Sequence, residues 1–600
     1  MKQFLLTMAG VFAGLVLFFF VAIFGFFGMI ASLAASGSKD ATPAHAVLEL
    51  DLREGLTDQD PQNPFAVFGG GGSQSVMTVI QVLRAAEKDN KVEGVFVRLP
   101  EGGMAPAAAD ELRLAFKHFR ASGKPIWAHS QGLYPSGAIL STYMLGAAAD
   151  QFWMQPDSSF QAVGMASEDI FFKRFFDKYG VKAAYEQRYE YKNAVNPYLY
   201  SDYTAAHRES ELSWMGSVYR TAVLTAAADR KANPQTFLAT IEAGPYSAED
   251  ARAKGLIDQV GQVKEAEDAL IAKVGDGAKI EDFDDYAAGA KARIAASGSG
   301  PTIAVVGAEG AIMTGRGGGG SPFGGDATIY SDDVAKAIYD AAEDKNVKAI
   351  VFRVSSPGGS DTASEQILAA VRAAKKAGKP VVVSMGTYAA SGGYWISSQA
   401  SAIVSQPTTL TGSIGVFGGK FALGEALGRF GVDVRDINVG SDYSAAFGTS
   451  SDFTPQQRAA FSAWMDRIYA GFVSRVAEGR KLPVDRVKQI AKGRVWTGVQ
   501  AQQLGLVDQL GGFYDAVDKA KSLAGIQGEV RLKTFGGARS PFEALSRMFG
   551  GTETSAKTLA AAAWVMGDPR SQAILDQMAQ ARLRERGATV LAPTPIRQGR

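Results

Sequence analysis

An internal repeat constrains this chain more than any other feature. Three pairs of blocks match: AAEKDNKVEGVFVRL (85–99) with AAEDKNVKAIVFRV (341–354), GKPIWAHS (123–130) with GKPVVVSMG (378–386), and PYSAEDARAKGLIDQVG (245–261) with VWTGVQAQQLGLVDQLG (495–511). Gly123 and Gly378 are 255 positions apart, and so are Ser136 and Ser391, whereas the last pair of blocks is offset by 250. Because several separated blocks match at nearly the same sequence offset, the chain contains a duplication.

Each copy alternates apolar strands with amphipathic helices. This order predicts an α/β fold, with parallel sheets and right-handed βαβ crossovers. A chain of 600 residues is also too long for one hydrophobic core. We therefore expect one domain at 46–300, a second at 301–540, and a peripheral, partly disordered extension at 541–600.

The amino-terminal region predicts a membrane anchor. No side chain between residues 3 and 38 is ionisable, and residues 11–33 are apolar apart from Ser32. A helix of this length would extend roughly 35 Å, enough to cross a bilayer. A cleaved signal peptide is the alternative, but the apolar run is longer than such peptides carry. We expect residues 1–45 to form an uncleaved transmembrane anchor and its linker.

Charge and cysteine content exclude several classes of function. The 62 Lys and Arg residues nearly balance the 61 Asp and Glu residues, so nothing indicates a nucleic-acid partner. The absence of cysteine excludes disulfides, thiolate metal sites and a cysteine nucleophile. No motif calls for a cofactor or a metal. All four histidines precede residue 210.

The stretch VVVSMGTYAASGGYW (381–395) carries the first candidate for chemistry. We expect a buried strand that stops at Gly386, a tight turn of small residues, and a helix that begins near Ser391. A hydroxyl at such a position suits a nucleophile. The alternative is that Ser391 only caps the helix, as serine often does.

The two copies differ where chemistry would be placed. The second has SPGGS (356–360) after its strand, where the first has PEGGM (100–104). The first has YKNAVNP (191–197), where the second has no lysine. One copy therefore keeps a candidate nucleophile and the other a candidate base, as expected for a duplicated enzyme with one shared site.

Lys192 is the candidate base because the second copy has no histidine. A lysine serves as a base only when burial lowers its pKa to roughly 7–8, and Tyr191, Ala194 and Val195 offer apolar surroundings. The mechanism requires the Lys192 amine to lie about 2.6–3.2 Å from the Ser391 hydroxyl. A histidine-based arrangement of His129 with Ser136 is the weaker alternative.

At these residues the chain resembles the signal peptide peptidase A family, in its long duplicated form, also called protease IV. The resemblance covers residues 1–540, and its most specific motifs are SPGGS (356–360), ASGGYW (390–395), TGSIGV (411–416) and YKNAVNP (191–197). It implies a ClpP/crotonase-like fold. The sequence departs from the usual family residues at Asn193, Asn196 and Ser355, and these changes bear only on local hydrogen bonding.

The resemblance also implies roles for individual residues. Ser391 would be the nucleophile and Lys192 the general base of a Ser/Lys dyad. Gly358 and Gly359 fall on the oxyanion-hole motif, Ser413 would orient the lysine, and Gly392 would support the serine.

The function implied is that of a membrane-anchored serine endopeptidase that degrades cleaved signal peptides through an acyl-enzyme. It would be a single-pass protein of the bacterial inner membrane, anchored in the lipid bilayer by residues 11–33, with the catalytic domain on the periplasmic side. Its partners would be signal-peptide remnants, other extended peptides and further copies of the chain in a homotetramer. A non-catalytic, membrane-tethered peptide-binding scaffold is the alternative, and an acyl-CoA enzyme of the crotonase type is a more distant one.

Overall fold

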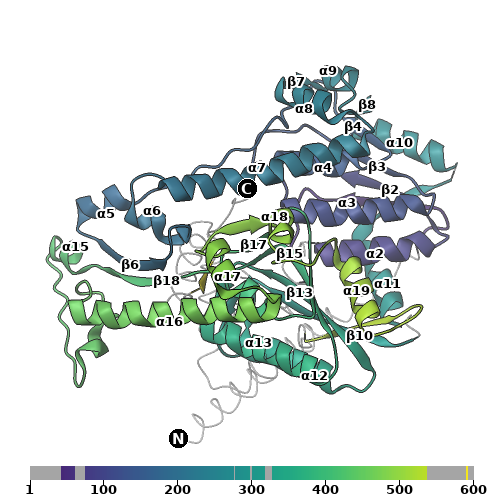
Figure 1. Ribbon diagram of the computed structural model, residues 1–600. Helices are drawn as coiled ribbons and strands as arrows, with labels where there is room; N and C mark the ends of the chain where they lie inside the picture. Colours follow the sequence, from purple (N-terminus) through teal and green to yellow (C-terminus); the bar gives the residue numbers. More distant parts are fainter. Residues whose placement is uncertain are drawn as a thin grey trace, which may run out of the picture.

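The computed structural model describes residues 42–60, 74–275, 277–296, 300–317, 327–536 and 590–591 (Figure 1). The predicted anchor at 11–33 and nearly all of the extension at 541–600 lie outside these ranges. Within them, no helix is long and apolar enough to cross a membrane.

The first half of the chain forms a sheet of six parallel strands in the order β8-β4-β3-β2-β1-β9. The strands of this half, inside and outside the sheet, are β1 (Ala46–Asp51), β2 (Val92–Arg98), β3 (Ile126–Ser130), β4 (Gln151–Met154), β5 (Ser159–Phe160), β6 (Lys182–Arg188), β7 (Tyr246–Ser247), β8 (Gln259–Val260) and β9 (Lys279–Asp282). Strands β5 and β7 form a separate antiparallel pair.

The helices of this half cover the sheet or extend away from it (Figure 1). They are α2 (Val76–Lys88), α3 (Pro106–Ala121), α4 (Ile139–Ala147), α5 (Lys173–Tyr179), the 3-10 helix η2 (Asn193–Val195), α6 (Asn196–Leu199), α7 (Ala205–Asp229), α8 (Pro234–Glu242), α9 (Ala248–Ala253), α10 (Val263–Val274) and α11 (Phe283–Ala296). Helices α2 and α3 show the expected amphipathic pattern, with the buried side chains on one face.

The second half repeats this strand order as β20-β16-β15-β13-β10-β21, again parallel. Strand β17 also pairs with β15, and β19 pairs antiparallel with β17. Its strands are β10 (Thr302–Glu309), β11 (Ala311–Met313), β12 (Thr328–Tyr330), β13 (Val347–Ser356), β14 (Gly358–Gly359), β15 (Val381–Ala390), β16 (Ala402–Ser405), β17 (Leu410–Gly412), β18 (Val416–Ala422), β19 (Val495–Thr497), β20 (Gln509–Leu510), β21 (Arg531–Phe535) and β22 (Val590–Leu591).

The helices of the second half follow in matching positions. They are α12 (Ser331–Glu343), α13 (Asp361–Lys376), α14 (Gly392–Ser397), α15 (Gly424–Gly428), the 3-10 helix η3 (Asp442–Ala445), α16 (Pro455–Arg480), α17 (Val484–Ile490), α18 (Gly498–Gln503) and α19 (Phe513–Leu523). The repeated order of strands and helices agrees with a duplicated α/β chain. The domain limits 46–300 and 301–540 remain our interpretation.

The strand before Ser391 is longer than the sequence predicts. Strand β15 does not stop at Gly386 but continues to Ala390. Its first part pairs with β16, and its last three residues pair with β17 instead. Gly386 is needed for a close approach rather than for a turn, because a Cβ at this residue would lie 2.5 Å from the Asp58 carboxylate.

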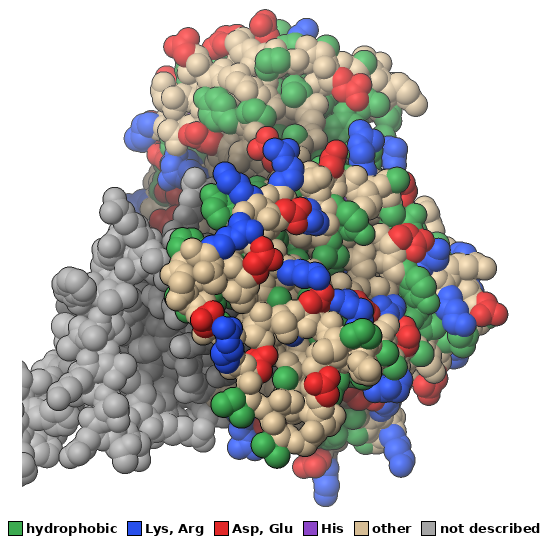
Figure 2. All heavy atoms as spheres, turned by 90° about the vertical axis from the view of Figure 1, so that its left-hand side faces the viewer, with side chains coloured by type: hydrophobic (Ala, Val, Ile, Leu, Met, Phe, Trp, Pro, Cys, Tyr) green, Lys and Arg blue, Asp and Glu red, His purple; other side chains and the backbone are tan. Residues whose placement is uncertain are grey.

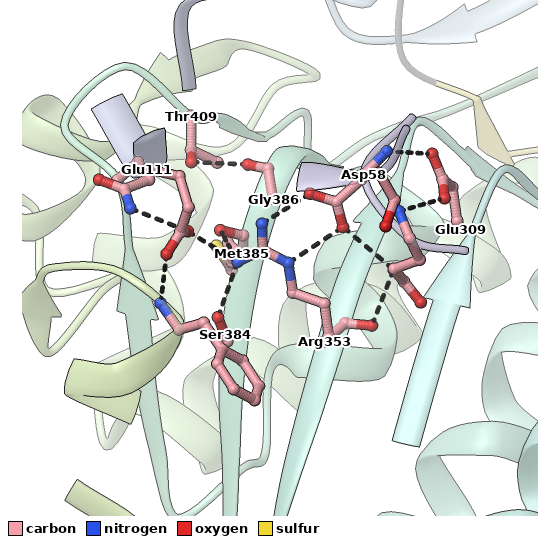
Figure 3. Close-up of polar contacts among 12 residues, drawn as sticks. Asp58, Glu111, Glu309, Arg353, Ser384, Met385, Gly386 and Thr409 are labelled. Atoms are coloured by element: carbon pink, nitrogen blue, oxygen red, sulfur yellow. Dashed lines mark hydrogen bonds and ion pairs between the residues drawn. The ribbon is translucent and has the colours of Figure 1, made fainter. Parts of the chain in front are cut away.

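A buried ion network joins the two halves (Figure 3). The Arg353 guanidinium of the second half donates to both oxygens of Asp58, at 2.6 and 3.0 Å, and to Glu111 at 3.0 Å, both from the first half. The backbone N–H groups of Asp58 and Gln59 donate to the Glu309 carboxylate at 2.9 and 2.8 Å. Removing one member of such a pair leaves a buried charge uncompensated, which costs about 3–5 kcal/mol. The network therefore fixes how the halves meet.

The β6–β18 pair carries strands from both halves. Strand β6 of the first half runs antiparallel to β18 of the second, from the pair Lys182 and Ala422 to the pair Arg188 and Val416. Figure 1 shows this pair at the left of the molecule, near α5, α6 and α15. Because β6 leads directly to residue 192, the pairing carries a segment of the first half to the edge of the second.

Candidate active site

Ser391 stands in a strained turn between β15 and α14. Its φ is 56° and its ψ is −117°, outside the favoured regions for a residue with a side chain. The side chain makes no capping hydrogen bond to the helix, so the helix-cap alternative is wrong. The backbone carbonyl accepts instead, from the Trp395 N–H at 2.8 Å. The turn thus leaves the hydroxyl available to other groups.

Lys192 meets the Ser391 hydroxyl across the two halves. The Lys192 Nζ lies 2.8 Å from the Ser391 Oγ, over a sequence separation of 199 residues. Both side chains are fully buried. Burial lowers the pKa of Lys192 well below its ordinary value, because the protein interior disfavours the ammonium form. This distance lies within the range that the sequence analysis requires for a lysine base.

Ser413 supplies two further contacts to the lysine. Its Oγ lies 3.0 Å from the Lys192 Nζ, and its backbone carbonyl lies 3.1 Å away. A neutral amine has two N–H donors and one lone pair. If both donors point at Ser413, the lone pair faces the Ser391 hydroxyl, which then donates to it. The Ser391 hydroxyl, the Ser413 hydroxyl and the Ser413 carbonyl can therefore all form hydrogen bonds with a neutral Lys192.

A short segment, Lys492 to Arg494, links the backbone around Lys192 to the backbone around Ser413. We call it the backbone clamp. The Lys492 carbonyl accepts from Tyr191 N–H at 3.2 Å, and the Arg494 carbonyl accepts from Ser413 N–H at 2.7 Å. Side chains strengthen these links, since Arg494 forms a bidentate ion pair with Glu209 at 2.6 and 2.7 Å.

Gly493, at the centre of the clamp, allows the closest approach. Its φ is +81°, and a Cβ there would lie 2.5 Å from the Lys192 Cβ and 2.7 Å from its Cα. The Gly493 N–H donates to the Ile414 carbonyl at 2.8 Å, so the segment cannot simply move aside. Any side chain at this residue would push against the lysine backbone. Gly493 therefore helps to set the position of Lys192 relative to Ser391.

No motif in the sequence points to the clamp. A signal was nevertheless present, because at the offset of 250 the first copy has Glu242, Ala243 and Gly244 where the clamp has Lys492, Gly493 and Arg494. Ala243 adopts an ordinary helical conformation with a φ of −82°. The left-handed glycine therefore belongs to the second copy alone, and the shared fold does not require it.

The glycine pair Gly358 and Gly359 packs directly against the turn that holds Ser391. A Cβ on Gly392 would lie 3.0 Å from the Gly359 nitrogen and 3.1 Å from the Gly358 Cα. Gly358 has a φ of 108°, and its N–H donates to the Ser356 Oγ at 3.1 Å. An oxyanion held by this N–H would compete with the Ser356 hydroxyl. The glycines thus lie beside the serine, as the motif predicts, with one amide occupied by a neighbour.

The His129 and Ser136 alternative does not form a site. His129 is buried in β3, and its Nε2–H donates to the Gly261 carbonyl at 3.1 Å. Burial lowers its pKa to about 4, so it is neutral at physiological pH. Among the described residues its Nδ1 has no partner, while Ser136 is exposed. His129 is a structural residue.

Comparison with known proteins places the chain in a family. The profile of Peptidase family S49 matches residues 118–275 and 373–527, one stretch in each half. The chain belongs to peptidase family S49. It is therefore a serine peptidase, similar to the long duplicated form of signal peptide peptidase A. A non-catalytic scaffold, the alternative that the sequence leaves open, does not fit this family.

The relatives extend over most of the chain. Protease 4 of Salmonella typhi is 34% identical over 514 residues, which make up 82% of this chain and 80% of that protein. Protease 4 of Haemophilus influenzae is 32% identical over 77% of this chain and 75% of its own length. The chloroplastic serine protease SPPA of Arabidopsis thaliana is 27% identical, covering 80% of this chain and 69% of that protein.

Proposed function

We propose that the chain cleaves peptides with a Ser/Lys dyad, in which Ser391 is the nucleophile and Lys192 is the general base. The observation that carries this proposal is the 2.8 Å separation between the Lys192 Nζ and the Ser391 Oγ, with both groups buried. A serine hydroxyl is a weak nucleophile until an adjacent base accepts its proton. The lowered pKa of Lys192 meets that need, since it favours the neutral amine, which is the form that accepts a proton.

The reaction proceeds by acyl transfer. The Ser391 Oγ attacks the peptide carbonyl carbon while its proton passes to the Lys192 Nζ, and a tetrahedral oxyanion forms. Backbone N–H groups of Gly358 and Gly359 stabilise that oxyanion once Ser356 releases the first of them. The C–N bond then breaks, Lys192 gives its proton to the leaving amine, and an acyl-enzyme ester remains. Water attacks the ester carbonyl carbon while Lys192 accepts its proton. The C–O bond to Ser391 then breaks, the peptide leaves with a new carboxyl terminus, and Lys192 returns the proton to the Ser391 Oγ.

The substrate class we propose is an extended peptide, with cleaved signal peptides as the physiological example. Strand β14, formed by Gly358 and Gly359, pairs antiparallel with Val590 and Leu591 of the same chain. This edge of the glycine pair is thus able to hydrogen-bond an extended strand, the mode by which many peptide-binding proteins hold their ligands. A peptide held there would run past the Ser391 hydroxyl.

The setting we propose follows the family resemblance. Residues 11–33 would anchor the protein in the bacterial inner membrane, with the catalytic halves on the periplasmic side. The fold would be of the ClpP/crotonase type, and four copies would assemble into a homotetramer. Ser413 would orient the lysine, and Gly392 would let the glycine pair approach the serine.

The proposal is tested with a serine-directed acylating reagent and a peptide substrate. The unmodified chain should be labelled at one residue and should cleave the peptide. Ser391→Ala should lose both properties, and Lys192→Ala should lose cleavage while remaining folded. Ser136→Ala, at the equivalent position of the first half, is the matched control and should keep both. Labelling of the Ser391→Ala protein, or normal turnover by Lys192→Ala, would overturn the dyad.

A further inference from the structure

Helix α14, which begins directly after Ser391, is held by its neighbours through one large side chain. Trp395 lies one turn along this helix, and its backbone N–H donates to the Ser391 carbonyl at 2.8 Å. The Trp395 side chain is 3% exposed and packs on Phe472 of α16, with 4.6 Å between the ring centroids. A rotation of α14 about its axis would therefore have to move this ring together with the backbone that carries the Ser391 hydroxyl.

Glu365 of α13 binds the polar end of the Trp395 ring. The indole Nε1–H donates to the Glu365 Oε2 at 3.0 Å. The Arg475 Nε, from α16, donates to the same oxygen at 2.5 Å, and the Arg372 Nη1 donates to the other oxygen at 2.8 Å. The Arg475 guanidinium also lies 5.0 Å from the centroid of the Trp395 ring. One carboxylate thus joins α13, α14 and α16 at a side chain one turn from the candidate nucleophile.

The Glu365 carboxyl is ionised at neutral pH, as an acceptor for three donors must be. Burial alone would raise its pKa, but the hydrogen bonds from Arg475, Trp395 and Arg372 hold the pKa below its ordinary value. Both carboxylate oxygens therefore accept hydrogen bonds from neighbouring helices.

The Glu365 network differs from the ion pairs at the surface of the molecule. Figure 2 shows Lys and Arg side chains interspersed with Asp and Glu side chains over the face at the left of Figure 1. Ion pairs between such exposed side chains contribute little. In the Glu365 network the side chain that is held, Trp395, is almost wholly buried. An indole N–H displaced from the carboxylate would lose its hydrogen bond without gaining one from water, so the ring is fixed in one position.

The first half lacks both partners of this contact. At the offset of 255 residues, Asp110 and Leu140 stand where the second half has Glu365 and Trp395. Leucine offers no side-chain N–H, and Asp110 accepts instead from the N–H and the hydroxyl of Thr408 in the second half. The contact therefore belongs to the half that carries the candidate nucleophile, and the shared fold does not require it.

We propose that Glu365 is a positioning residue of this peptidase, which holds Trp395 and thereby fixes α14 so that the Ser391 hydroxyl meets the Lys192 amine. The inference rests on the proposed Ser/Lys dyad. Glu365 touches neither the substrate nor a reacting atom, and it acts only through the ring. Proton transfer depends on the 2.8 Å separation between the Lys192 Nζ and the Ser391 Oγ, and a shift of about 1 Å in such a geometry lowers the rate about 10²-fold.

Glu365→Leu in the full-length, detergent-solubilised protein tests the proposal. The change removes the acceptor, so kcat for cleavage of a peptide should fall about 10-fold or more, while KM should change much less. Asp229→Leu is the matched control in the first half. Asp229 accepts from Arg113 and so joins α7 to α3, the counterparts of α16 and α13. The control should keep its kcat, and an equal loss of kcat in both variants would overturn the proposal.

Trp395→Phe supplies a second variant that keeps an aromatic ring in the core and removes only the N–H donor. It should lower kcat by itself. Because both single changes remove the same hydrogen bond, the double variant with Glu365→Leu should be no slower than the slower single variant. A full kcat in Trp395→Phe would contradict the positioning role. So would a double variant in which the two losses multiply, because the two side chains would then act independently.

Labelling with a serine-directed acylating reagent, read out by mass spectrometry, separates a failure of this inference from a failure of the dyad. Ser391 should be labelled in every variant, and more slowly in Glu365→Leu and Trp395→Phe than in the unmodified chain. Labelling of Ser391 at an unchanged rate in Glu365→Leu would refute the positioning role and leave the dyad intact. Labelling of another residue in the unmodified chain would refute the dyad itself, and the inference with it.

Discussion

The two halves of this chain share one strand order but treat corresponding residues differently. Ser391 is buried against a lysine, whereas its counterpart Ser136 is exposed. At the offset of 251, Ser413 corresponds to Ala162, and Lys192 to Tyr443. The lysine thus comes from the first half alone, and the serine with its surrounding groups comes from the second half alone. The candidate site therefore exists only where these parts of the two halves meet.

Replacing Lys192, the side chain that the first half contributes, should have the largest effect on activity. Lys192→Met should lower kcat about 10²–10⁴-fold, the usual contribution of a general base. The same change should stabilise the fold at neutral pH. A folded-state pKa below the unfolded one means that folding releases a proton, so the native lysine becomes more favourable as pH rises from its lowered pKa toward its ordinary value.

Denaturant unfolding at pH 7 and pH 9.5 measures this second effect. The stability advantage of Lys192→Met over the unmodified chain should be larger at pH 7. An advantage that is equal at both values would show that Lys192 does not titrate abnormally.

A substitution in the backbone clamp tests whether the second half sets the position of Lys192. Gly493→Ala should displace the Lys192 backbone and lower kcat about 10²-fold, since a shift of about 1 Å at a reacting group has that consequence. KM should change much less. The pH profile should also move, because a displaced lysine loses its contacts with Ser413.

Gly378→Ala is the matched control for the clamp. Gly378 has a φ of +79°, nearly that of Gly493, but no atom lies within 4 Å of a Cβ built there. Both variants therefore carry the same backbone strain, of about 1–2 kcal/mol, and differ in the contact with Lys192. Equal losses of kcat in the two variants would remove the positioning role of Gly493.

Ser413→Ala should have a moderate effect, because it makes the second half resemble the first at this position. It removes the Oγ contact with the Lys192 Nζ but leaves the backbone carbonyl in place. Loss of one neutral hydrogen bond costs about 0.5–1.5 kcal/mol, or roughly 2–10-fold in rate. Steady-state kinetics with a peptide substrate measures this change, and a loss as large as that of Lys192→Met would assign Ser413 a more direct role.

The smallest effect concerns how the halves are joined, and it appears in stability rather than in activity. Burial raises the pKa of Glu309 to about 7. It also raises to about 6 the pKa of Asp110, a carboxyl of the first half that accepts from the N–H and the hydroxyl of Thr408 in the second half. A raised carboxyl pKa means that the folded state holds protons that the unfolded state releases. The stability that these two carboxyl groups contribute to the folded state is therefore present below about pH 4 and is lost as the pH rises toward 7.

Glu309→Gln should flatten this pH dependence. Denaturant unfolding between pH 4.5 and pH 7.5 should show a smaller loss of stability in the variant than in the unmodified chain, by an amount of the order of 2 kcal/mol or less. Glu425→Gln, on an exposed side chain of α15, is a suitable control. A slope unchanged by Glu309→Gln would show that this carboxyl ionises normally.

Residue types and offsets were sufficient to predict part of this structure. The repeat, the alternation of strands and helices, and the pairing of Ser391 with Lys192 could all be read from the sequence. The roles of those two residues remain a proposal. The distance between their side chains could be predicted because proton transfer from a hydroxyl to an amine requires the two groups to lie within hydrogen-bond reach.

Features that depend on two surfaces meeting could not be predicted in the same way. Asp58 and Arg353 are 295 residues apart, and no local pattern indicates that they form an ion pair. Gly386 looks like a turn residue but lies within a strand, because its missing side chain makes room for Asp58. The clamp at Gly493 has no local sequence signature for the same reason. Its importance arises from the backbone it touches.

The clamp has a consequence for the order in which this peptidase matures. As the chain is made, Lys192 emerges first, Ser391 emerges 199 residues later, and the segment from Lys492 to Arg494 follows after about another hundred. A nascent chain that stops before this segment contains both side chains without the backbone contacts that align them. With the proposed dyad, the ability to cleave peptides therefore begins only after Arg494 has been incorporated and folded.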